Sequence, residues 1–379
     1  MAVSAFILAG EASGDLYGSS LVKELKLKDS MADIRAWGGD LMKEQGVDLV
    51  KHYKDHNYMG FLEVIINLGT ILKNISFCKQ DIKAFSPDAL ILIDFPGFNM
   101  RIAKYFYQYS FPVLYYIAPQ VWAWKENRVE AIKKYVDKLY VILPFEKEFL
   151  KKHGVESNYM GHPLLEHILN FKDKESVSKS KFVEEHGLEV EKPIISLLPG
   201  SRKQEIEKKL PVMLHAVSSY SEDFNIVIAG MENFKNLYRE ITSNSNAKVI
   251  YKDTYNLLNN SNIALVTSGT ATLETAFFNV PQIVCYKTSW LSYIIAKSLV
   301  KIKYISLVNL IMDEEVVKEL IQKDLSYFKI TKELNLLNNA LALNKMKDAY
   351  QVLITKCQGE NVSKNIALDM FKTIESFQK

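Results

Sequence analysis

The stretch LAGEASGDLYG, residues 8–18, follows a short apolar run at the start of the chain. Such a run predicts a buried strand, and the small residues after it predict a tight turn into a helix. Gly10, Gly14 and Gly18 would let the backbone approach another group closely, as phosphate-binding turns do. Their spacing differs from the G-x-G-x-x-G of dinucleotide-binding proteins, and Glu11 would repel a phosphate. A nicotinamide dinucleotide is therefore disfavoured as the ligand of this turn.

Strand-like and helix-like segments alternate along the chain, as in α/β proteins with parallel sheets. Five runs in the first half predict strands: Val3 to Leu8, Ile34 to Trp37, Ala89 to Ile93, Val113 to Ile117 and Leu139 to Leu143. A polar stretch near residues 165–192 interrupts the alternation. Five more runs follow it: Ile194 to Leu198, Asn225 to Ala229, Lys248 to Tyr251, Ile263 to Val266 and Gln282 to Cys285. The sequence thus predicts two Rossmann-like α/β domains, residues 1–170 and 188–330, and a helical tail, residues 331–379.

Length, charge and cysteine content limit the classes of function. A chain of 379 residues is longer than one hydrophobic core usually supports, which agrees with two domains. The 47 Lys and Arg residues nearly balance the 44 Asp and Glu residues, so the net charge of +3 gives no electrostatic reason to expect nucleic acid. Cys78, Cys285 and Cys357 are odd in number and far apart, which argues against disulfides or a zinc site and favours a reducing cytoplasm.

Motifs for export, membrane spanning and metal binding are missing from the sequence. The N-terminal apolar run has no basic flank and no cleavage site, so no signal peptide is predicted. Residues 105–124 are uncharged, but Pro112, Pro119 and several tyrosines predict a strand and a loop there. A Walker-type lysine loop, H-E-x-x-H and Asp-x-Asp do not occur, so a site without metal or cofactor is predicted.

The second half contains a turn with the composition of a diphosphate site. SLLPGSRKQEI, residues 196–206, predicts a strand, a Pro-Gly turn and a helix that opens at Ser201 and Arg202. The N–H groups of a helix start, close approach at Gly200 and the Arg202 guanidinium together suit a diphosphate. The alternative is that Ser201 only caps the helix and Arg202 pairs with Glu205.

A second turn repeats this arrangement. TSGTATLETAFFNVPQI, residues 267–283, places Ser268, Gly269 and Thr270 at a helix start. Glu274, one turn into that helix, can accept hydrogen bonds from a ribose diol while hydroxyls and amides hold phosphate. Alternatively, Glu274 is an acid favoured by the helix dipole. Two such turns in one domain favour a nucleotide diphosphate as the ligand.

The first half offers a candidate base. LILIDFPGFNMRIA, residues 90–103, places Asp94 at the end of an apolar strand, before Pro96, Gly97 and Asn99. A carboxylate against apolar walls has a raised proton affinity and can take a proton from a hydroxyl group. Acids at strand ends also serve as acceptors in turns and caps, and this alternative stays open for Asp94.

Aromatic and histidine residues follow the later strands of the first half. Residues 115–150 carry Trp122 and Trp124 in a loop before a basic helix, where they can face a sugar or an acyl chain, or pack in the core. MGHPLLE, residues 160–166, places His162 in a turn after a predicted strand. There it can hold a phosphate or donate a proton, or it can bond to the backbone as a structural residue.

One segment is unusually apolar. MGFLEVIINLGTILKNISF, residues 59–77, has Glu63 and Lys73 as its only charges, and Lys79 and Lys83 follow it. Its apolar positions cover more of a helix than a core-facing stripe needs, so acyl-chain or membrane contact and ordinary burial are both open. Nearby lysines would suit anionic lipid head groups. The residues predicted to contact acyl chains or the membrane are Leu62, Val64, Ile65, Leu68 and Leu72.

Motifs along the chain resemble, in order, those of lipid-A-disaccharide synthases: AGEASGDLYG, MGFLEV, IDFPGFN, APQVWAWKENRV, LPFEKEF, GHP, LPGSRKQEI, SGTATLE and SLVNL. The resemblance runs from residue 9 to about residue 310. It implies a GT-B glycosyltransferase, whose two parallel sheets face across a cleft, with the nucleotide donor on the second domain and the lipid acceptor on the first. The implied reaction is a metal-free, inverting transfer from UDP-2,3-diacylglucosamine to the 6-hydroxyl of 2,3-diacylglucosamine 1-phosphate, giving a β-1,6-linked disaccharide and UDP.

The resemblance also carries residue roles over by position. Asp94 matches the acid of the family's Ile-Asp-x-Pro-x-Phe-Asn motif and Arg202 the arginine of Gly-Ser-Arg, and these are the predicted catalytic residues. The predicted donor contacts are Gly200, Ser201, Arg202, Ser268, Gly269, Thr270, Glu274 and Asn309. Two positions depart from the pattern: Gly97 stands where some relatives carry a second aspartate, and Val308 where some carry proline.

The acidic glycine turn suits a rim that faces the hydroxyls of an acceptor sugar. The predicted acceptor contacts are Glu11, Ser13, Gly14, Asn99, Trp124 and His162. Peripheral attachment to the cytoplasmic face of the inner membrane is expected, and the helical tail past Ile330 can serve a homodimer or bridge back to the first domain. Two other functions stay open: a UDP-sugar epimerase of the same architecture, and a non-catalytic UDP-sugar-binding regulator.

Overall fold

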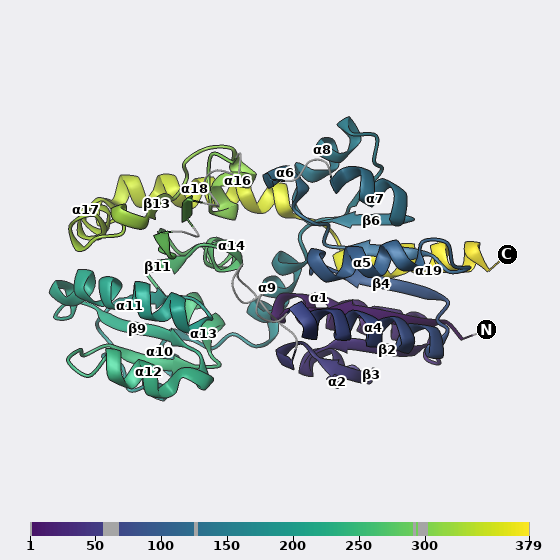
Figure 1. Ribbon diagram of the computed structural model, residues 1–379. Helices are drawn as coiled ribbons and strands as arrows, with labels where there is room; N and C mark the ends of the chain where they lie inside the picture. Colours follow the sequence, from purple (N-terminus) through teal and green to yellow (C-terminus); the bar gives the residue numbers. More distant parts are fainter. Residues whose placement is uncertain (1, 56–67, 125–127, 291–292, 295–301, 379) are drawn as a thin grey trace. The chain divides into compact units, whose positions relative to one another are not determined.

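The computed structural model describes residues 2–55, 68–124, 128–290, 293–294 and 302–378. The chain forms two units: a first unit of Met1–Glu166 with Cys357–Lys379, and a second unit of His167–Lys356. Each unit is built on its own parallel sheet with helices packed on it (Figure 1). Within the described residues, no helix is both long enough and apolar enough to cross a membrane.

The first unit has a seven-stranded sheet in the order β3-β2-β1-β4-β5-β6-β7. Its strands are β1 (Ser4–Ala9), β2 (Asp33–Gly38), β3 (Asp48–His52), β4 (Ala89–Ile93), β5 (Val113–Tyr116), β6 (Lys138–Val141) and β7 (Asn158–Tyr159). Its helices are α1 (Ala12–Lys28), α2 (Asp40–Glu44), α4 (Leu68–Phe85), α5 (Pro96–Phe106), α6 (Val121–Trp124), α7 (Val129–Tyr135), α8 (Glu146–Lys152) and α19 (Val362–Phe377). The sequence did not predict β3 and β7, edge strands that lack a continuous apolar run.

Strand β4 explains why this sheet forms. Its sequence, ALILI, is apolar throughout and completely buried, because helices cover both faces of a parallel sheet. Alternate side chains point to opposite faces of the sheet. Leu90 and Leu92 pack in one hydrophobic core with residues of α4 and α5. The strand order reverses between β1 and β4, and ligands of such sheets bind beyond the carboxyl ends of the strands at that point.

The second unit has a six-stranded parallel sheet in the order β10-β9-β8-β11-β12-β13, which reverses between β8 and β11. Its strands are β8 (Ile194–Leu198), β9 (Asn225–Gly230), β10 (Lys248–Tyr251), β11 (Ile263–Thr267), β12 (Gln282–Tyr286) and β13 (Lys318–Ile321). Its helices are α10 (Lys179–Glu185), α11 (Lys203–Val217), α12 (Lys235–Ile241), α13 (Thr254–Asn259), α14 (Thr270–Phe277), α16 (Leu307–Met312) and α17 (Tyr327–Leu337). Helices α9 (Pro163–Lys174) and α18 (Ala340–Cys357) include the points where one unit gives way to the other. The predicted α/β class is confirmed, and β13 is an edge strand that the sequence did not predict.

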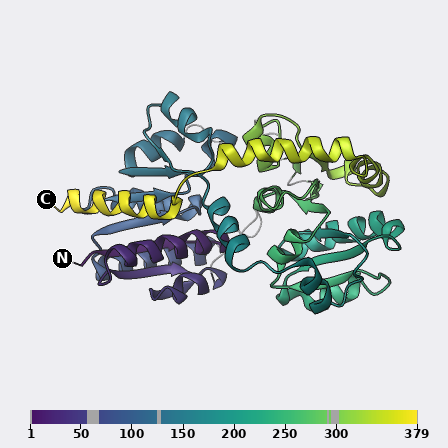
Figure 2. The same ribbon diagram turned by 180° about the vertical axis from the view of Figure 1, so that it is seen from behind.

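The last helix, α19, belongs to the first unit and lies beside α1 (Figure 2). Asp369 anchors it, since this carboxylate pairs with Lys138 at 2.7 Å and accepts a hydrogen bond from the Tyr140 hydroxyl at 2.9 Å. The N–H of Ser363 donates to Glu166 at 3.0 Å and holds the start of the helix. The sequence did not decide where the helical tail packs. In the structure its last helix packs on the first unit.

Two glycines allow the chain to cross itself next to α19. Gly161 has a φ of +109°, which favours glycine, and a Cβ there would lie 2.7 Å from the Cα of Gly359. The neighbouring N–H of His162 donates to the carbonyl of Cys357 at 2.8 Å. The GHP motif therefore lies where the chain after β7 crosses the segment that leads into α19.

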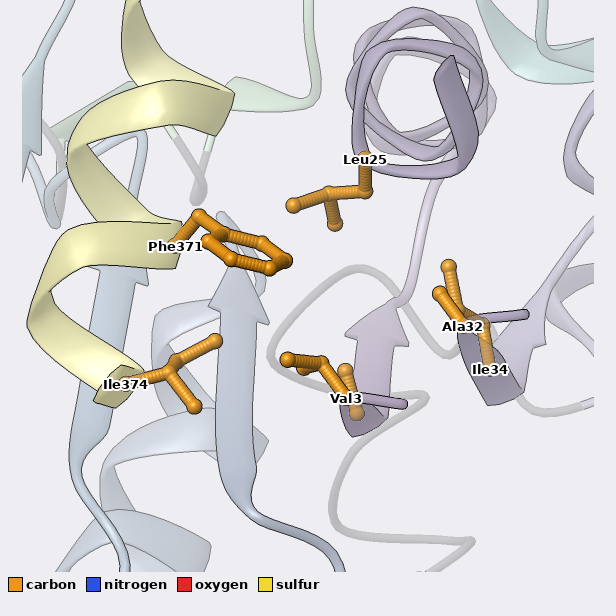
Figure 3. A pocket seen from close by; sticks show the side chains of 7 residues that line it. Val3, Leu25, Ala32, Ile34, Phe371 and Ile374 are labelled. Atoms are coloured by element: carbon orange, nitrogen blue, oxygen red, sulfur yellow. The ribbon is translucent and has the colours of Figure 1, made fainter. Parts of the chain in front are cut away.

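An apolar cavity of about 10 Å³ lies between α19, α1 and the sheet (Figure 3). Leu25 from α1 and Phe371 and Ile374 from α19 point toward Val3 and Ile34 at the sheet. The cavity has scarcely the volume of one water and offers almost no polar partner. It is a packing seam under α19 and does not suit a ligand.

Candidate active site

The glycine turn that ends β1 packs against the protein itself. A side chain at Gly10 would overlap the ring of Phe95. At Gly14 a Cβ would lie 3.2 Å from the Cβ of Ala9, and at Gly18 it would lie 2.7 Å from a methionine sulfur. These glycines allow close packing around α1, where the sequence had suggested approach to a ligand. Gly14, predicted as an acceptor contact, is buried at this packing surface.

Asp94 lies at the carboxyl end of β4, where the strand order reverses. It and Phe95 have left-handed φ angles of 47° and 49°, an uncommon conformation that strains a bulky residue and clusters at functional sites. Two side chains hold the Asp94 carbonyl: the Asn99 amide donates to it at 2.8 Å and the Tyr115 hydroxyl at 2.7 Å. Hydrogen bonds from α5 and β5 therefore fix the position of Asp94 at the edge of the sheet.

The carboxyl group of Asp94 has an altered proton affinity. Burial raises the pKa of Asp94 to about 6, although a hydrogen bond from the backbone of Phe95 opposes the shift. The residue is still partly exposed. A carboxylate with a pKa this close to neutral is mostly ionised at pH 7 and binds a proton more tightly than a solvated aspartate does. Both properties suit a general base.

Asn99 and His162, two predicted acceptor contacts, are buried and bonded to the backbone. The Asn99 amide also donates to the carbonyl of Ile93 at 3.2 Å, so this residue positions Asp94. The N–H of Leu164 donates to His162 Nδ1 at 3.2 Å. Burial lowers the pKa of His162 to about 3, so its imidazole is neutral at pH 7 and does not suit a phosphate.

Other predicted acceptor residues lie at the start of α1 or outside the described side chains. Glu11 directly precedes α1, Ser13 lies in its first turn, and both are partly exposed at the edge that carries Asp94. The side chain of Trp124 lies outside the described residues. Contact of these three residues with an acceptor stays a prediction.

Glu146, the first of the two acids in LPFEKEF, has no role predicted from the sequence. Its side chain is buried at the carboxyl end of β6 and accepts a hydrogen bond from the indole N–H of Trp122 at 3.0 Å. The available signal was an acid in the turn after an apolar strand, similar to the signal that singled out Asp94.

Both predicted diphosphate turns lie where the second sheet reverses, after β8 and β11. Gly200 and Gly269 have φ angles of +118° and +122°, which favour glycine. A side chain at Gly200 would overlap the carboxylate of Glu205, whereas among the described residues no atom lies within 4 Å of a Cβ built at Gly269. Helix α11 begins at Lys203 and α14 at Thr270, so each turn presents helix N-terminal N–H groups that suit an anion.

Two cations accompany the Gly200 turn. Arg202 has a side chain that is 54% exposed, with Nη1 lying 3.8 Å from Glu205 Oε1. This is the pairing that the sequence left as an alternative, and an exposed pair at that distance is weak. Lys209, which the sequence did not single out, is buried, donates to the Thr267 hydroxyl and lies 3.9 Å from Glu205 Oε2. Burial lowers the pKa of Lys209, and Glu205 opposes this shift.

The Gly269 turn differs from expectation in one hydrogen bond. The Ser268 hydroxyl donates to the carbonyl of Ile305 at 2.8 Å, so its proton is directed at the protein. Glu274 accepts a hydrogen bond from the Tyr255 hydroxyl at 3.2 Å, and burial raises the pKa of this glutamate. Contact of Glu274 with a ribose stays a prediction, and the groups of this turn that are left to donate to a phosphate are its backbone N–H groups.

Asn309, a predicted donor contact, is completely buried, and both polar atoms of its side chain have hydrogen-bond partners in the protein. Its amide donates to the carbonyl of Val317 at 2.8 Å and to Glu319 Oε1 at 2.9 Å, and its oxygen accepts from the Val317 N–H at 2.9 Å. Glu319 also accepts the N–H groups of Ile305 and Ser306. Asn309 therefore helps to hold in place the segment whose Ile305 carbonyl accepts the Ser268 hydroxyl, and its side chain is buried away from any ligand.

The two sheet edges offer different chemistry. The edge of the first unit presents a carboxylate able to take a proton, and the edge of the second unit presents two amide-rich turns and an arginine able to bind a diphosphate. In the described part of the chain, no group of His, Cys, Asp and Glu residues could hold a metal ion.

This chain is similar in sequence and in fold to known proteins. The lipid-A-disaccharide synthetase family profile matches residues 5–370. Lipid-A-disaccharide synthase 1 of Legionella pneumophila (strain Lens) is 36% identical over 341 residues, which cover 88% of this chain and 87% of that protein.

Solved structures with low sequence identity share the fold. The UDP-GlcNAc 2-epimerase from Neisseria meningitidis bound to UDP-GlcNAc has a TM-score of 0.66 at 13% identity and covers 99% of this chain and 100% of that chain. The glycosyltransferase from Rickettsia africae ESF-5 has a TM-score of 0.57 at 14% identity and covers 99% of both chains. These similarities agree with the GT-B type of α/β fold. Because the family profile spans nearly the whole chain and a relative shares more than a third of the aligned residues, this chain belongs to the lipid-A-disaccharide synthase family of glycosyltransferases.

Proposed function

We propose that this chain transfers diacylglucosamine from UDP-2,3-diacylglucosamine to the 6-hydroxyl of 2,3-diacylglucosamine 1-phosphate, with inversion, and releases UDP. Membership of the family supports the reaction class. The observation that carries the chemistry is Asp94, a carboxyl group with a raised pKa, held at the sheet reversal of the first unit by hydrogen bonds from Asn99 and Tyr115.

In this mechanism Asp94 acts on the acceptor. It takes the proton of the 6-hydroxyl as that oxygen forms a bond to the anomeric carbon of the donor. The bond from that carbon to the UDP oxygen breaks on the opposite face, which inverts the configuration. A pKa of about 6 leaves Asp94 ionised before the step and able to hold the proton afterwards.

The second unit acts on the donor. Backbone N–H groups at the Gly200 and Gly269 turns and the Arg202 guanidinium bind the diphosphate and stabilise the negative charge that develops on departing UDP. Glu274 accepts hydrogen bonds from the ribose. Lys209 pairs with Glu205 from the buried side, which lowers the repulsion between this carboxylate and the diphosphate.

UDP release is expected to require both substrates. Purified protein incubated with the acylated UDP donor alone should release UDP at the background rate, and addition of the acylated sugar phosphate should start release together with disaccharide formation. The measurement is a coupled assay for UDP with mass spectrometry of the lipid product. An epimerase would convert the donor without an acceptor, and a regulator would bind UDP without turnover, so either result would contradict the proposal.

We also propose that helix α4 brings the protein to the cytoplasmic face of the inner membrane. Leu68 and Leu72 are 47% and 55% exposed, although apolar side chains on a helix usually face the core. Exposed Lys73 and Lys83 lie on the same helix and suit anionic lipid head groups. The other residues predicted for this contact, Leu62, Val64 and Ile65, lie outside the described residues.

Replacing Leu68 and Leu72 together with serine is expected to lower binding to vesicles that contain anionic phospholipids by roughly 30-fold, since each exposed leucine adds on the order of 1 kcal/mol of apolar transfer. Affinity for UDP should not change. The measurement is co-sedimentation with vesicles. Leu27→Ser is the control, because Leu27 is 70% exposed on α1 of the same unit. Equal loss in the control, or no loss in the double variant, would contradict a role for α4.

A further inference from the structure

Glu146 is a buried acid that the mechanism above does not use. It is the first residue of α8, directly after the apolar β6 strand and its turn, and it is 2% exposed. Removing a carboxylate from water is costly, so a buried acid needs hydrogen-bond donors around it. The structure provides three such donors from two different segments.

The carboxylate joins the turn after β6 to helix α6. Glu146 Oε2 accepts the N–H groups of Ile142 at 3.2 Å and Leu143 at 2.9 Å. Its Oε1 accepts the indole N–H of Trp122 at 3.0 Å. The Trp122 ring also packs edge-on against Phe145, with 5.0 Å between ring centroids. Polar and apolar contacts therefore fix this indole in one orientation.

Helix α6 begins close to the candidate base. Strand β5 lies beside β4, with Tyr116 paired to Ile93, and the N–H of Asp94 donates to the carbonyl of Tyr116 at 3.0 Å. The chain continues from β5 through residues 117–120 into α6, which carries Trp122. Burial is the main cause of the raised pKa of Glu146, and the charge of Asp94 adds a smaller contribution, which agrees with the closeness of the two carboxyl groups.

We propose that Glu146 is a positioning residue for the acceptor: by holding the Trp122 indole, its carboxylate fixes the segment of residues 117–124 next to Asp94. The inference rests on the proposed function only in assigning this edge to the acceptor. Glu146 touches neither substrate nor the reacting atoms in this account, and it acts through Trp122.

The chemistry of the three donors predicts how substitutions behave. Burial raises the pKa of Glu146 to about 7, although the three hydrogen bonds oppose this shift. At pH 8 the carboxylate is therefore mostly ionised and accepts all three hydrogen bonds, so the variants are compared at that pH. Glutamine at this position has one accepting oxygen, so if that oxygen serves Ile142 and Leu143, its NH₂ group faces the Trp122 N–H and the two donors repel. Trp122→Phe removes that N–H and therefore the conflict. The effect of Glu146→Gln is thus expected to be smaller when Trp122 is already phenylalanine.

The test is a double-mutant cycle of Glu146→Gln and Trp122→Phe, with Glu148→Gln as the control because Glu148 is an exposed acid in the same first turn of α8. Glu146→Gln alone is expected to lower kcat/KM for the lipid acceptor by roughly 10- to 100-fold, the size of effect seen when reacting groups are slightly misplaced. The Kd for UDP, measured by calorimetry, should stay within twofold of wild type. In the Trp122→Phe background, Glu146→Gln should cost roughly tenfold less than it does in wild type.

Hydrogen exchange separates this inference from the proposed function. Amides of residues 117–124 are expected to exchange faster in Glu146→Gln, and this result does not depend on which reaction the enzyme performs. Equal activity losses in the two Trp122 backgrounds, or unchanged exchange in residues 117–124, would overturn the positioning role. Absence of transfer activity in the wild type, with faster exchange in the variant, would instead overturn the proposed function alone.

Discussion

Replacing Asp94 with asparagine is expected to lower kcat by ~100- to 10,000-fold, the usual contribution of a general base. Asparagine has the same shape and tolerates the left-handed φ of 47° as well as aspartate does, so the backbone held by Asn99 and Tyr115 should not move. The amide cannot take a proton from the acceptor hydroxyl. The measurement is the steady-state rate of UDP release with both substrates saturating.

The pH dependence of the wild type checks the same role. With a pKa of about 6, Asp94 gains its negative charge as the pH rises, so kcat/KM is expected to increase with a midpoint near pH 6 and then level off. The remaining activity of Asp94→Asn should lack this acidic limb. A variant with near-normal turnover, or one that keeps the limb, would show that Asp94 is not the base.

Stability provides the control for Asp94→Asn. Folding raises the pKa of this carboxyl from 3.8 to about 6, so the folded state binds the proton more tightly than the unfolded chain. The free energy of unfolding therefore falls as the pH rises through this range, and at pH 8 the wild type has lost that contribution. Asp94→Asn is expected to unfold at the same or a higher temperature at pH 8. A clear drop in Tm would indicate a structural cause for lost activity.

Replacing Arg202 with alanine is expected to lower kcat by about 100- to 1,000-fold, the range found when one donor to a developing negative charge is removed. The guanidinium is half exposed at the Gly200 turn and forms only a weak pair with Glu205, so it can be recruited to the diphosphate at little cost. Arg202→Lys should recover only part of the loss, because an ammonium cannot form two parallel hydrogen bonds to a phosphate. The measurements are kcat and the Kd for UDP.

Lys203→Ala is the matched control for Arg202→Ala. Lys203 is the next residue along the chain, carries the same charge, is exposed, and pairs with Glu207 at 3.7 Å. It should lose less than about threefold in kcat, as expected for an exposed pair worth under 1 kcal/mol. Equal losses in the two variants would mean that only the net charge near the turn matters. This result would contradict direct binding of the diphosphate by the Arg202 guanidinium.

Local patterns were sufficient to locate the chemistry along the chain. Apolar runs such as ALILI have the length of strands, and the glycines at positions 200 and 269 end two of them, so the loops at the sheet edges could be identified before the fold was known. Asp94 follows such a strand directly, and Arg202 lies in the turn after another. Their placement depends on strand ends, which neighbouring residues specify.

Side-chain burial and hydrogen bonding could not be predicted in this way, because they depend on how the strands and helices pack together in the folded chain. Asn99 and Asn309 look like ligand contacts in their motifs, yet both are buried and bonded to carbonyl groups of the protein. Glu146 has its indole partner 24 residues away, and Lys209 has its hydroxyl partner 58 residues away. No local pattern contains these pairs.

The sequence by itself determined two doubly wound sheets, the turns at their reversal points and the family, since strand length, glycine turns and motif order are local properties. The tertiary structure decided which polar groups face a ligand and which hold the protein together. The physical reason is that burying a polar group is costly unless a partner is supplied, and Asp94, Glu146 and Asn309 have partners on β5, α6 and β13.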